Sequence, residues 1–140
     1  MVRINLIDPA LLADQHLVAE YDEILMLLGH VRKCAMDKDV PISYCLGKGH
    51  IKFFKDKLGY LKKRHERLKK EMRKRGFKPV REIDLSEFDP GLRNDWRPSR
   101  KDIDIIKRRI SEKIRKKPGF YRYYGEHRPV GFFLGLLKKA

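Results

Sequence analysis

The stretch VRINLIDPALLADQHLVAEYDEILMLLGHVRK, Val2–Lys33, holds almost no positive charge in a chain that is otherwise strongly basic. Residues 1–30 contain one basic side chain, Arg3, against five acidic ones, and carry a net charge of −4, whereas the whole chain carries +15. The remaining residues therefore carry +19. Carboxylates next to bound phosphates would weaken the binding of a polyanion, so they are more consistent with a catalytic role. This stretch is therefore the first indication of an enzyme.

The same stretch predicts a long helix. Asp8 and Pro9 are typical of a helix start, with Asp8 as N-cap and Pro9 at the first helical position, and the pattern continues to about Met36. The stripe expected to be buried consists of Leu17, Tyr21, Ile24, Leu28 and Val31. A second stripe consists of His16, Glu20, Glu23, Leu27 and His30. From spacing alone, Glu20, Asp22 and Glu23 are interpreted as a solvated helix surface.

A second helix is predicted from His50 to Arg75, ended by Gly76 as a C′ residue. Its buried stripe is expected to be Ile51, Phe54, Leu58, Leu61, Leu68 and Met72. Its other face is expected to carry nine cations: Lys62, Lys63, Arg64, Arg67, Lys69, Lys70, Arg73, Lys74 and Arg75. These charges repel one another unless an anionic partner offsets them.

A third helix is predicted to begin with a capping box from Ser99 to Asp102 and to end at Pro118-Gly119. Its core stripe is Ile103, Ile106, Ile110 and Ile114, and its opposite face offers Lys107, Arg108, Arg109, Lys113 and Lys117. In the long loop before it, Trp96 is interpreted as an anchor. No stretch alternates cleanly enough for a sheet, so we predict an all-α fold of three main helices with long loops.

The length of 140 residues predicts one domain spanning residues 1–140. Within it, residues 126–140 form an apolar extension, which we expect to be a short helix packed on the domain or on a partner. In the segment from Phe120 to Gly125, one arginine, Arg122, stands among aromatic side chains. It can stack on unpaired bases or pack as a plug on the first helix, and both interpretations stay open.

The composition narrows the class of protein further. A pI near 10 indicates a nucleic-acid partner, although a ribosomal-type protein or a membrane-surface binder would carry the same charge. No apolar run approaches the ~20 residues that span a bilayer and no signal peptide is present, which predicts a cytoplasmic protein. Cys34 and Cys45 lack zinc-site spacing, so no metal and no cofactor are expected. The absence of Thr and the scarcity of Asn and Gln are typical of thermophilic proteins.

Three ordered blocks of this sequence resemble a known family. They are RINL, LADQHLVAEYDE and VRK within residues 3–33, LGKGHIKFFKDKLGYLKKRHERL at residues 46–68, and EKIRKKPGFYRYYG at residues 112–125. Together they are similar to the phage-type endonuclease V family, the pyrimidine dimer DNA glycosylases with lyase activity. The resemblance implies a bundle of three main helices whose N-terminal segment threads to the active site.

The resemblance also implies residue roles. The nucleophile would be the α-amine of Val2, exposed once Met1 is removed, and Glu23 would be the catalytic carboxylate. An α-amine suits this role, because its pKa near 7.7–8.0 leaves far more of it neutral at pH 7 than a lysine. Expected DNA contacts are Arg3, Gln15, His16, Arg32, Lys33, Arg109, Lys113, Lys117, Tyr121, Arg122, Tyr123 and Tyr124.

The sequence departs from the family at two lesion-proximal positions. Asp22 and Met26 stand where the family has arginines, which removes two phosphate contacts. The expected activity is a glycosylase and AP lyase, acting as a monomer on damaged double-stranded DNA with pyrimidine dimers as the lesion. The alternatives are an AP lyase without dimer recognition and a non-catalytic basic nucleic-acid-binding protein.

Overall fold

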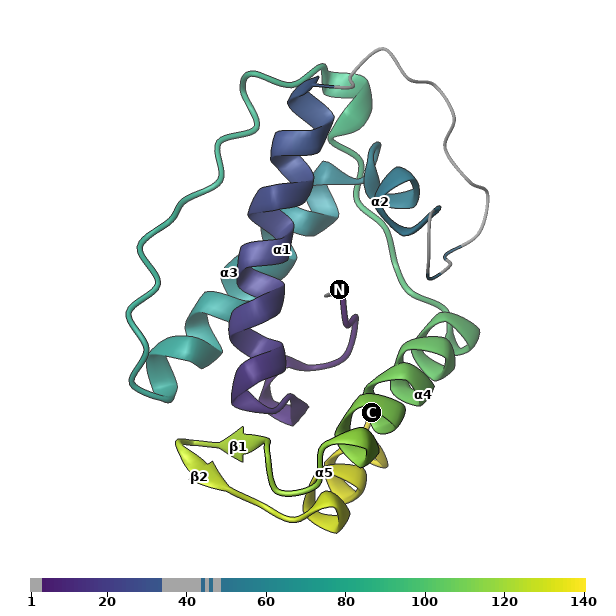
Figure 1. The fold of residues 1–140 in the computed structure, drawn as a ribbon. Coiled ribbons are helices and arrows are strands. Elements are labelled where there is room, and N and C mark those ends of the chain that lie inside the picture. Colours follow the sequence, from purple (N-terminus) through teal and green to yellow (C-terminus); the bar gives the residue numbers. More distant parts are fainter. Residues whose placement is uncertain (1–3, 34–43, 45, 47–48) are drawn as a thin grey trace.

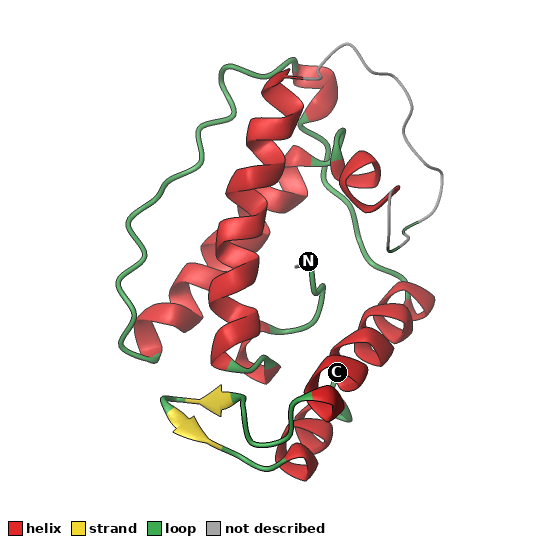
Figure 2. Ribbon diagram, in the orientation of Figure 1, coloured by secondary structure: helices red, strands yellow, loops and turns green. Residues whose placement is uncertain are grey.

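The computed structural model describes residues 4–33, 44, 46 and 49–140. The predicted all-α class is confirmed, because helices dominate this part of the chain and its strands are confined to one small hairpin (Figure 2). In chain order the elements are η1 (Pro9–Leu11), α1 (Asp14–Lys33), α2 (Gly49–Phe54), α3 (Leu58–Lys74), η2 (Pro90–Leu92), α4 (Arg100–Lys116), β1 (Arg122–Tyr123), β2 (Glu126–His127) and α5 (Val130–Leu137).

Helices α1 and α3 pack side by side and form the main layer of the core (Figure 1). The predicted apolar stripe of α1 is confirmed, because all five of its residues are buried: Leu17, Tyr21, Ile24, Leu28 and Val31. From α3, Leu61, Leu68 and Met72 complete the contact. The two longest apolar stripes of the sequence therefore meet each other, as amphipathic helices require.

The predicted start of the first helix is wrong. The Asp8 carboxylate caps only the short 3₁₀ helix η1, where it accepts from the Ala10 amide at 3.0 Å. Leu12 then takes an extended conformation, with φ −90° and ψ 144°, and breaks the helical path. Helix α1 begins at Asp14 instead. The predicted end near Met36 lies outside the described residues.

The predicted helix from His50 to Arg75 is two helices, α2 and α3, separated at residues 55–57. The break is stabilised by a distant loop. The Asn94 side chain donates to the Asp56 carbonyl at 2.9 Å, and the Tyr60 amide donates to the Asn94 carbonyl at 3.2 Å. These bonds replace helical ones, so tertiary contacts override local propensity. The predicted stop at Gly76 is confirmed by its left-handed φ of +89°.

Gly59 marks the tightest approach between this loop and α3. A Cβ at Gly59 would lie 2.6 Å from the Arg93 carbonyl oxygen. We therefore expect Gly59→Ala to destabilise the fold by about 1–3 kcal/mol in urea unfolding. Gly29→Ala is the matched control, because Gly29 lies inside α1 with open space around it, and it should stabilise by up to ~1 kcal/mol. Equal effects of both changes would contradict the close approach.

Helix α4 begins as predicted. Ser99 and Asp102 form a reciprocal capping box, with the Ser99 amide donating to Asp102 at 2.8 Å. Its isoleucines Ile106, Ile110 and Ile114 are buried and Ile103 is half-buried. The C-terminal extension forms the short helix α5, which packs against α4 and buries Phe133 and Leu137.

The hairpin β1–β2 differs from the expectation that no sheet forms. Arg122 pairs with His127 and Tyr123 with Glu126 in antiparallel register. The turn between them uses Tyr124 and Gly125, both at positive φ, 53° and 81°. Such a two-residue turn usually carries Asn or Asp before the glycine, so a tyrosine there leaves little signal in the sequence.

Trp96 acts as an anchor, as predicted. Its ring packs edge-on against Phe53, Phe54 and Tyr60, with ring centroids 5.1–5.6 Å apart. These contacts tie the loop before α4 to α2 and α3. None of the helices in the described part of the chain is long and apolar enough to cross a lipid bilayer.

Candidate active site

The N-terminal segment is buried and held through its backbone. The Ile4 amide donates to His50 Nε2 at 3.0 Å, and the Tyr44 hydroxyl donates to the Ile4 carbonyl at 3.3 Å. The Asn5 amide donates to Glu20 Oε1 at 3.2 Å. Figure 1 shows this segment running between α1 and α4. The chain is thus fixed in place from Ile4 onward, directly after the residues predicted to carry the nucleophile.

The Glu20 carboxylate is neutralised by Arg64 of α3, and both side chains are fully buried. Arg64 Nε donates to Glu20 Oε2 at 2.7 Å and Nη2 to Oε1 at 3.0 Å, a bidentate pair. Arg64 Nη1 also donates to the Ile7 carbonyl. Burial alone would lower the pKa of Arg64, but the Glu20 carboxylate outweighs it and raises the pKa. The interpretation of Glu20 as solvated is wrong.

Glu23 lies one helical turn beyond Glu20, about 4.5 Å along the axis. Its side chain is nearly buried, with 8% exposed, so it is not a solvated surface group either. Asp22, which points away from this stripe, is exposed as expected. Val2 and Arg3 lie outside the described residues. The predicted catalytic carboxylate therefore shares a buried helix face with the carboxylate that binds the N-terminal segment.

His16 connects this face to the cations of α4. The pKa of His16 is lowered to about 4, first by burial and then by the charges of Arg109 and Lys113. The Tyr121 ring lies 4.8 Å from the imidazole, between centroids. Nδ1 of His16 is buried without a hydrogen-bond partner among the described residues. The structure thus relates four predicted site residues, with the imidazole of His16 close to Tyr121 and under the charges of Arg109 and Lys113.

The buried imidazole makes stability depend on pH. Between pH 6.5 and about 4 the unfolded chain binds a proton at His16 that the folded chain does not, so stability falls as the pH drops through this window. We expect the wild type to lose about 3 kcal/mol more than His16→Asn between pH 7 and pH 4. Urea unfolding at both pH values measures it. His30→Asn, an exposed change on the same helix, is the control and should behave as the wild type.

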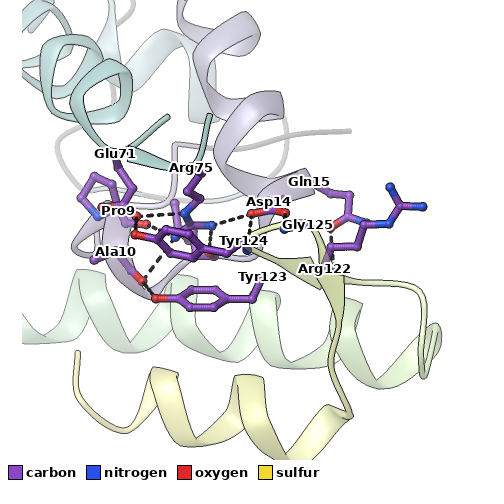
Figure 3. A network of polar contacts seen from close by, with 11 residues as sticks. Pro9, Ala10, Asp14, Gln15, Glu71, Arg75, Arg122, Tyr123, Tyr124 and Gly125 are labelled. Atoms are coloured by element: carbon purple, nitrogen blue, oxygen red, sulfur yellow. Dashed lines mark hydrogen bonds and ion pairs between the residues drawn. The ribbon is translucent and has the colours of Figure 1, made fainter. Parts of the chain in front are cut away.

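Gln15 fixes the aromatic segment onto this site. Its Nε2 donates to the Phe120 carbonyl at 3.0 Å, and its Oε1 accepts from the Arg122 amide at 2.9 Å (Figure 3). The two bonds flank Tyr121, which is buried against His16. Gln15 therefore determines where Tyr121 lies.

Tyr123 and Tyr124 are also tied to the start of α1. The Tyr123 hydroxyl donates to the Ala10 carbonyl at 2.9 Å. The Asp14 carboxylate accepts from the amides of Tyr124 and Gly125 at 3.1 and 2.8 Å (Figure 3). These contacts agree with the interpretation of this segment as a plug that packs on the first helix. Tyr124 remains 46% exposed, so base stacking by this ring stays a prediction.

Arg75 joins these elements at one point. Its Nη1 lies 2.9 Å from Asp14 Oδ1, and its Nε lies 2.9 Å from Glu71 Oε2. The same guanidinium donates to the carbonyls of Pro9 and Leu12 (Figure 3). One buried arginine thus holds the end of α3, the η1 turn and the first residue of α1.

Three of the nine cations predicted on the other face of the second predicted helix have no exposed side-chain surface: Arg64, Lys69 and Arg75. Lys69 pairs with Glu66 and Glu82, each at 2.8 Å. The sequence contains a signal for Arg64, which lies three residues after Leu61 and four before Leu68 and so falls on the buried stripe. The prediction grouped Arg64 with the other cations because of its charge, although its spacing places it on the apolar face.

The other predicted DNA contacts are Arg32, Lys33, Lys117 and Arg122. Arg32 and Lys33 are exposed at the opposite end of α1, and Arg32 pairs with Glu87 at 2.5 Å. Lys117 caps the C-terminus of α4 and is exposed. Arg122 is exposed on β1. These side chains extend the cationic surface rather than line the face around Glu23.

The two departures from the family lie together on the outer side of α1. Asp22 and the 68% exposed Met26 line a hollow of about 760 Å³ with Pro79 and Val80. Across residues 4–33, 44, 46 and 49–140, no cluster of three or more His, Cys, Asp or Glu side chains could hold a metal ion. Cys34 and Cys45 lie outside the described residues.

The site thus combines two buried carboxylates of α1, an anchored N-terminal segment, and a histidine under the charge of two cations of α4. The sequence model of one family, described as pyrimidine dimer DNA glycosylase, matches residues 1–85. The match covers more than half of the chain and includes α1, α2, α3 and Glu23. The protein belongs to the pyrimidine dimer DNA glycosylase family, and membership implies that DNA is its substrate.

Proposed function

We propose that this protein excises pyrimidine dimers from duplex DNA and cuts the resulting abasic site, using the α-amine of Val2. The observation that supports the proposal most is the hydrogen bond from the Asn5 amide to Glu20, which lies on the same face of α1 as Glu23. Three residues span at most about 11 Å, so this bond is compatible with an amine of Val2 that reaches the Glu23 face.

The chemistry begins at the sugar of the damaged nucleotide. The neutral amine attacks C1′, the glycosidic bond breaks and the base leaves, and opening of the sugar ring gives an iminium ion that links Val2 to C1′. The amine must be neutral to attack, so incision should rise with pH up to about 8, where an α-amine titrates.

Glu23 completes the reaction. Its carboxylate stabilises the positive charge that develops on the sugar and helps open the ring. It then accepts the C2′ proton, and the electrons of the C2′–H bond expel the 3′ phosphate by β-elimination. Water hydrolyses the imine and releases the amine of Val2.

The cationic residues bind the DNA backbone in this proposal. Arg3 contacts a phosphate beside the reacting sugar, and Gln15 and His16 line the site. Backbone contacts come from Arg109, Lys113 and Lys117, and further contacts from Arg32, Lys33, Tyr121, Arg122, Tyr123 and Tyr124. Membership of the family supports bending of the duplex, since damaged DNA is easier to deform.

These contacts make binding depend steeply on salt. We expect affinity for a duplex with an abasic analogue to fall by about 10³ between 50 and 200 mM salt, since roughly six phosphates are contacted. Lys113→Gln should reduce the slope of log affinity against log salt by about one. A flat salt response would contradict binding through the backbone.

Borohydride trapping on abasic duplex tests the mechanism. Reduction of the iminium ion should link the protein to DNA, and acetylation of the α-amine should abolish the link. Trapping that persists after acetylation would assign the nucleophile to a lysine. Absence of any trapped species would favour the alternative of a non-catalytic nucleic-acid-binding protein.

A second candidate function is an AP lyase without dimer recognition. The exposed Asp22 and Met26 favour it, because they place a negative charge and an uncharged side chain where the family has arginines. Incision of duplex that contains a single dimer separates the two functions. We further propose that residues 1–140 act as one domain and as a monomer, with α5 packed on α4.

A further inference from the structure

A hollow of about 400 Å³ lies between α3, the loop before α4 and the N-terminal segment. Its base includes Leu6 and Ile103, and its rim carries Lys63, Arg67 and Arg97. The volume is within the range of pockets that hold small ligands. Arg64 also lines the hollow, which therefore adjoins the buried Glu20–Arg64 pair, whereas Lys113 lies ten residues beyond Ile103, about 15 Å along α4.

The charge of the rim is unbalanced. Lys63 is paired with Asp95 at 2.7 Å. Arg67 and Arg97 are exposed, and neither makes an ion pair or hydrogen bond to another residue in the described part of the chain. Two guanidinium groups at the mouth of one hollow suit a phosphate, which they can bind through paired N–H donors.

The wall of the hollow is aromatic. Trp96 lines it with its ring half-buried; Tyr44 stacks on the indole at 6.1 Å between centroids, and edge contacts to Phe53 and Phe54 fix its orientation, so a base would use the side that faces the hollow. Tyr60 stands next to it, and burial raises the pKa of Tyr60 to about 12, so its hydroxyl remains a donor. A rigid indole beside cations is the arrangement that stacks an unpaired base.

We propose that this hollow is a second nucleotide-binding site, which takes a phosphate on Arg67 and Arg97 and an unpaired base on Trp96. The nucleotide has two possible sources, a free mononucleotide or a single strand of DNA. The site requires no damaged base and no Schiff base, so it does not depend on the chemistry proposed for Val2.

Trp96 is the only tryptophan of the chain, so its fluorescence reports on this hollow alone. Titration of the full chain with thymidine monophosphate, at constant ionic strength, should change the emission with saturation. Thymidine, which lacks the phosphate, should leave it unchanged at the same concentrations. Arg67→Gln and Arg97→Gln should each weaken binding about tenfold, the usual effect of losing a charge-assisted hydrogen bond.

Arg73→Gln is the matched control, because Arg73 is exposed on the same helix outside the hollow. It should bind thymidine monophosphate like the wild type. Absence of a fluorescence change, an equal effect of thymidine, or an equal loss in Arg73→Gln would each overturn the site. A short oligothymidylate identifies the source: tighter binding than the mononucleotide indicates a single strand, and equal binding indicates a free nucleotide.

Discussion

Replacing Glu23 with Gln should stop strand cleavage while leaving the covalent intermediate in place. The amide keeps the size of the side chain but cannot accept the C2′ proton, so incision of preformed abasic duplex should fall by about a hundredfold or more. The amine of Val2 still attacks, so borohydride should trap at least as much protein on DNA as in the wild type. Single-turnover incision and trapping on the same substrate measure both effects.

The control for this change lies next to it in the sequence. Asp22→Asn also neutralises a carboxylate on α1, but Asp22 is exposed and Glu23 is nearly buried. Asp22→Asn should retain incision within a few-fold. If Glu23→Gln cleaves abasic DNA as fast as Asp22→Asn, another group accepts the proton and the proposed role of Glu23 is wrong.

Arg64→Met should unfold the protein at much lower urea concentration. It leaves the Glu20 carboxylate fully buried without its cation, and breaking such a pair from one side costs about 3–5 kcal/mol. Arg100→Met is the control, since Arg100 pairs with Asp104 on the surface and this change should cost less than about 1 kcal/mol.

The double variant Glu20→Leu with Arg64→Met separates stability from function. Two apolar side chains of similar size remove both buried charges, so part of the lost stability should return. Incision should stay low, because the Asn5 amide loses its acceptor and the N-terminal segment loses an anchor. Recovery of full incision in the double variant would mean that Glu20 does not position this segment.

Much of the helical pattern is predictable because it depends on local chemistry. The capping box at Ser99, the stop at Gly76 and the apolar stripe of α1 each follow from residues within one or two turns of each other. The break between α2 and α3 is not predictable in this way. It depends on Asn94, which lies far along the chain and replaces the helical hydrogen bonds around Asp56.

The candidate site shows the same division. Glu20 and Glu23 are buried because of the way α1 packs in the fold. Their spacing along the sequence places them on one helix face but does not tell whether that face is buried or solvated. Arg109 and Lys113, more than ninety residues further along the chain, lower the pKa of His16 only because the tertiary fold brings their charges near it. Spacing within either helix carries no information about this relation.

The Asp14 carboxylate has a consequence for how the molecule assembles. Its acceptors are filled by Arg75 at the end of α3 and by two amides of the β1–β2 turn. The first residue of the central helix is therefore completed by a segment synthesised about 110 residues later. A ribosome-bound chain that stops before Tyr124 has Arg75 but lacks the two turn amides, so the contacts of Asp14 are completed only after the β1–β2 turn emerges.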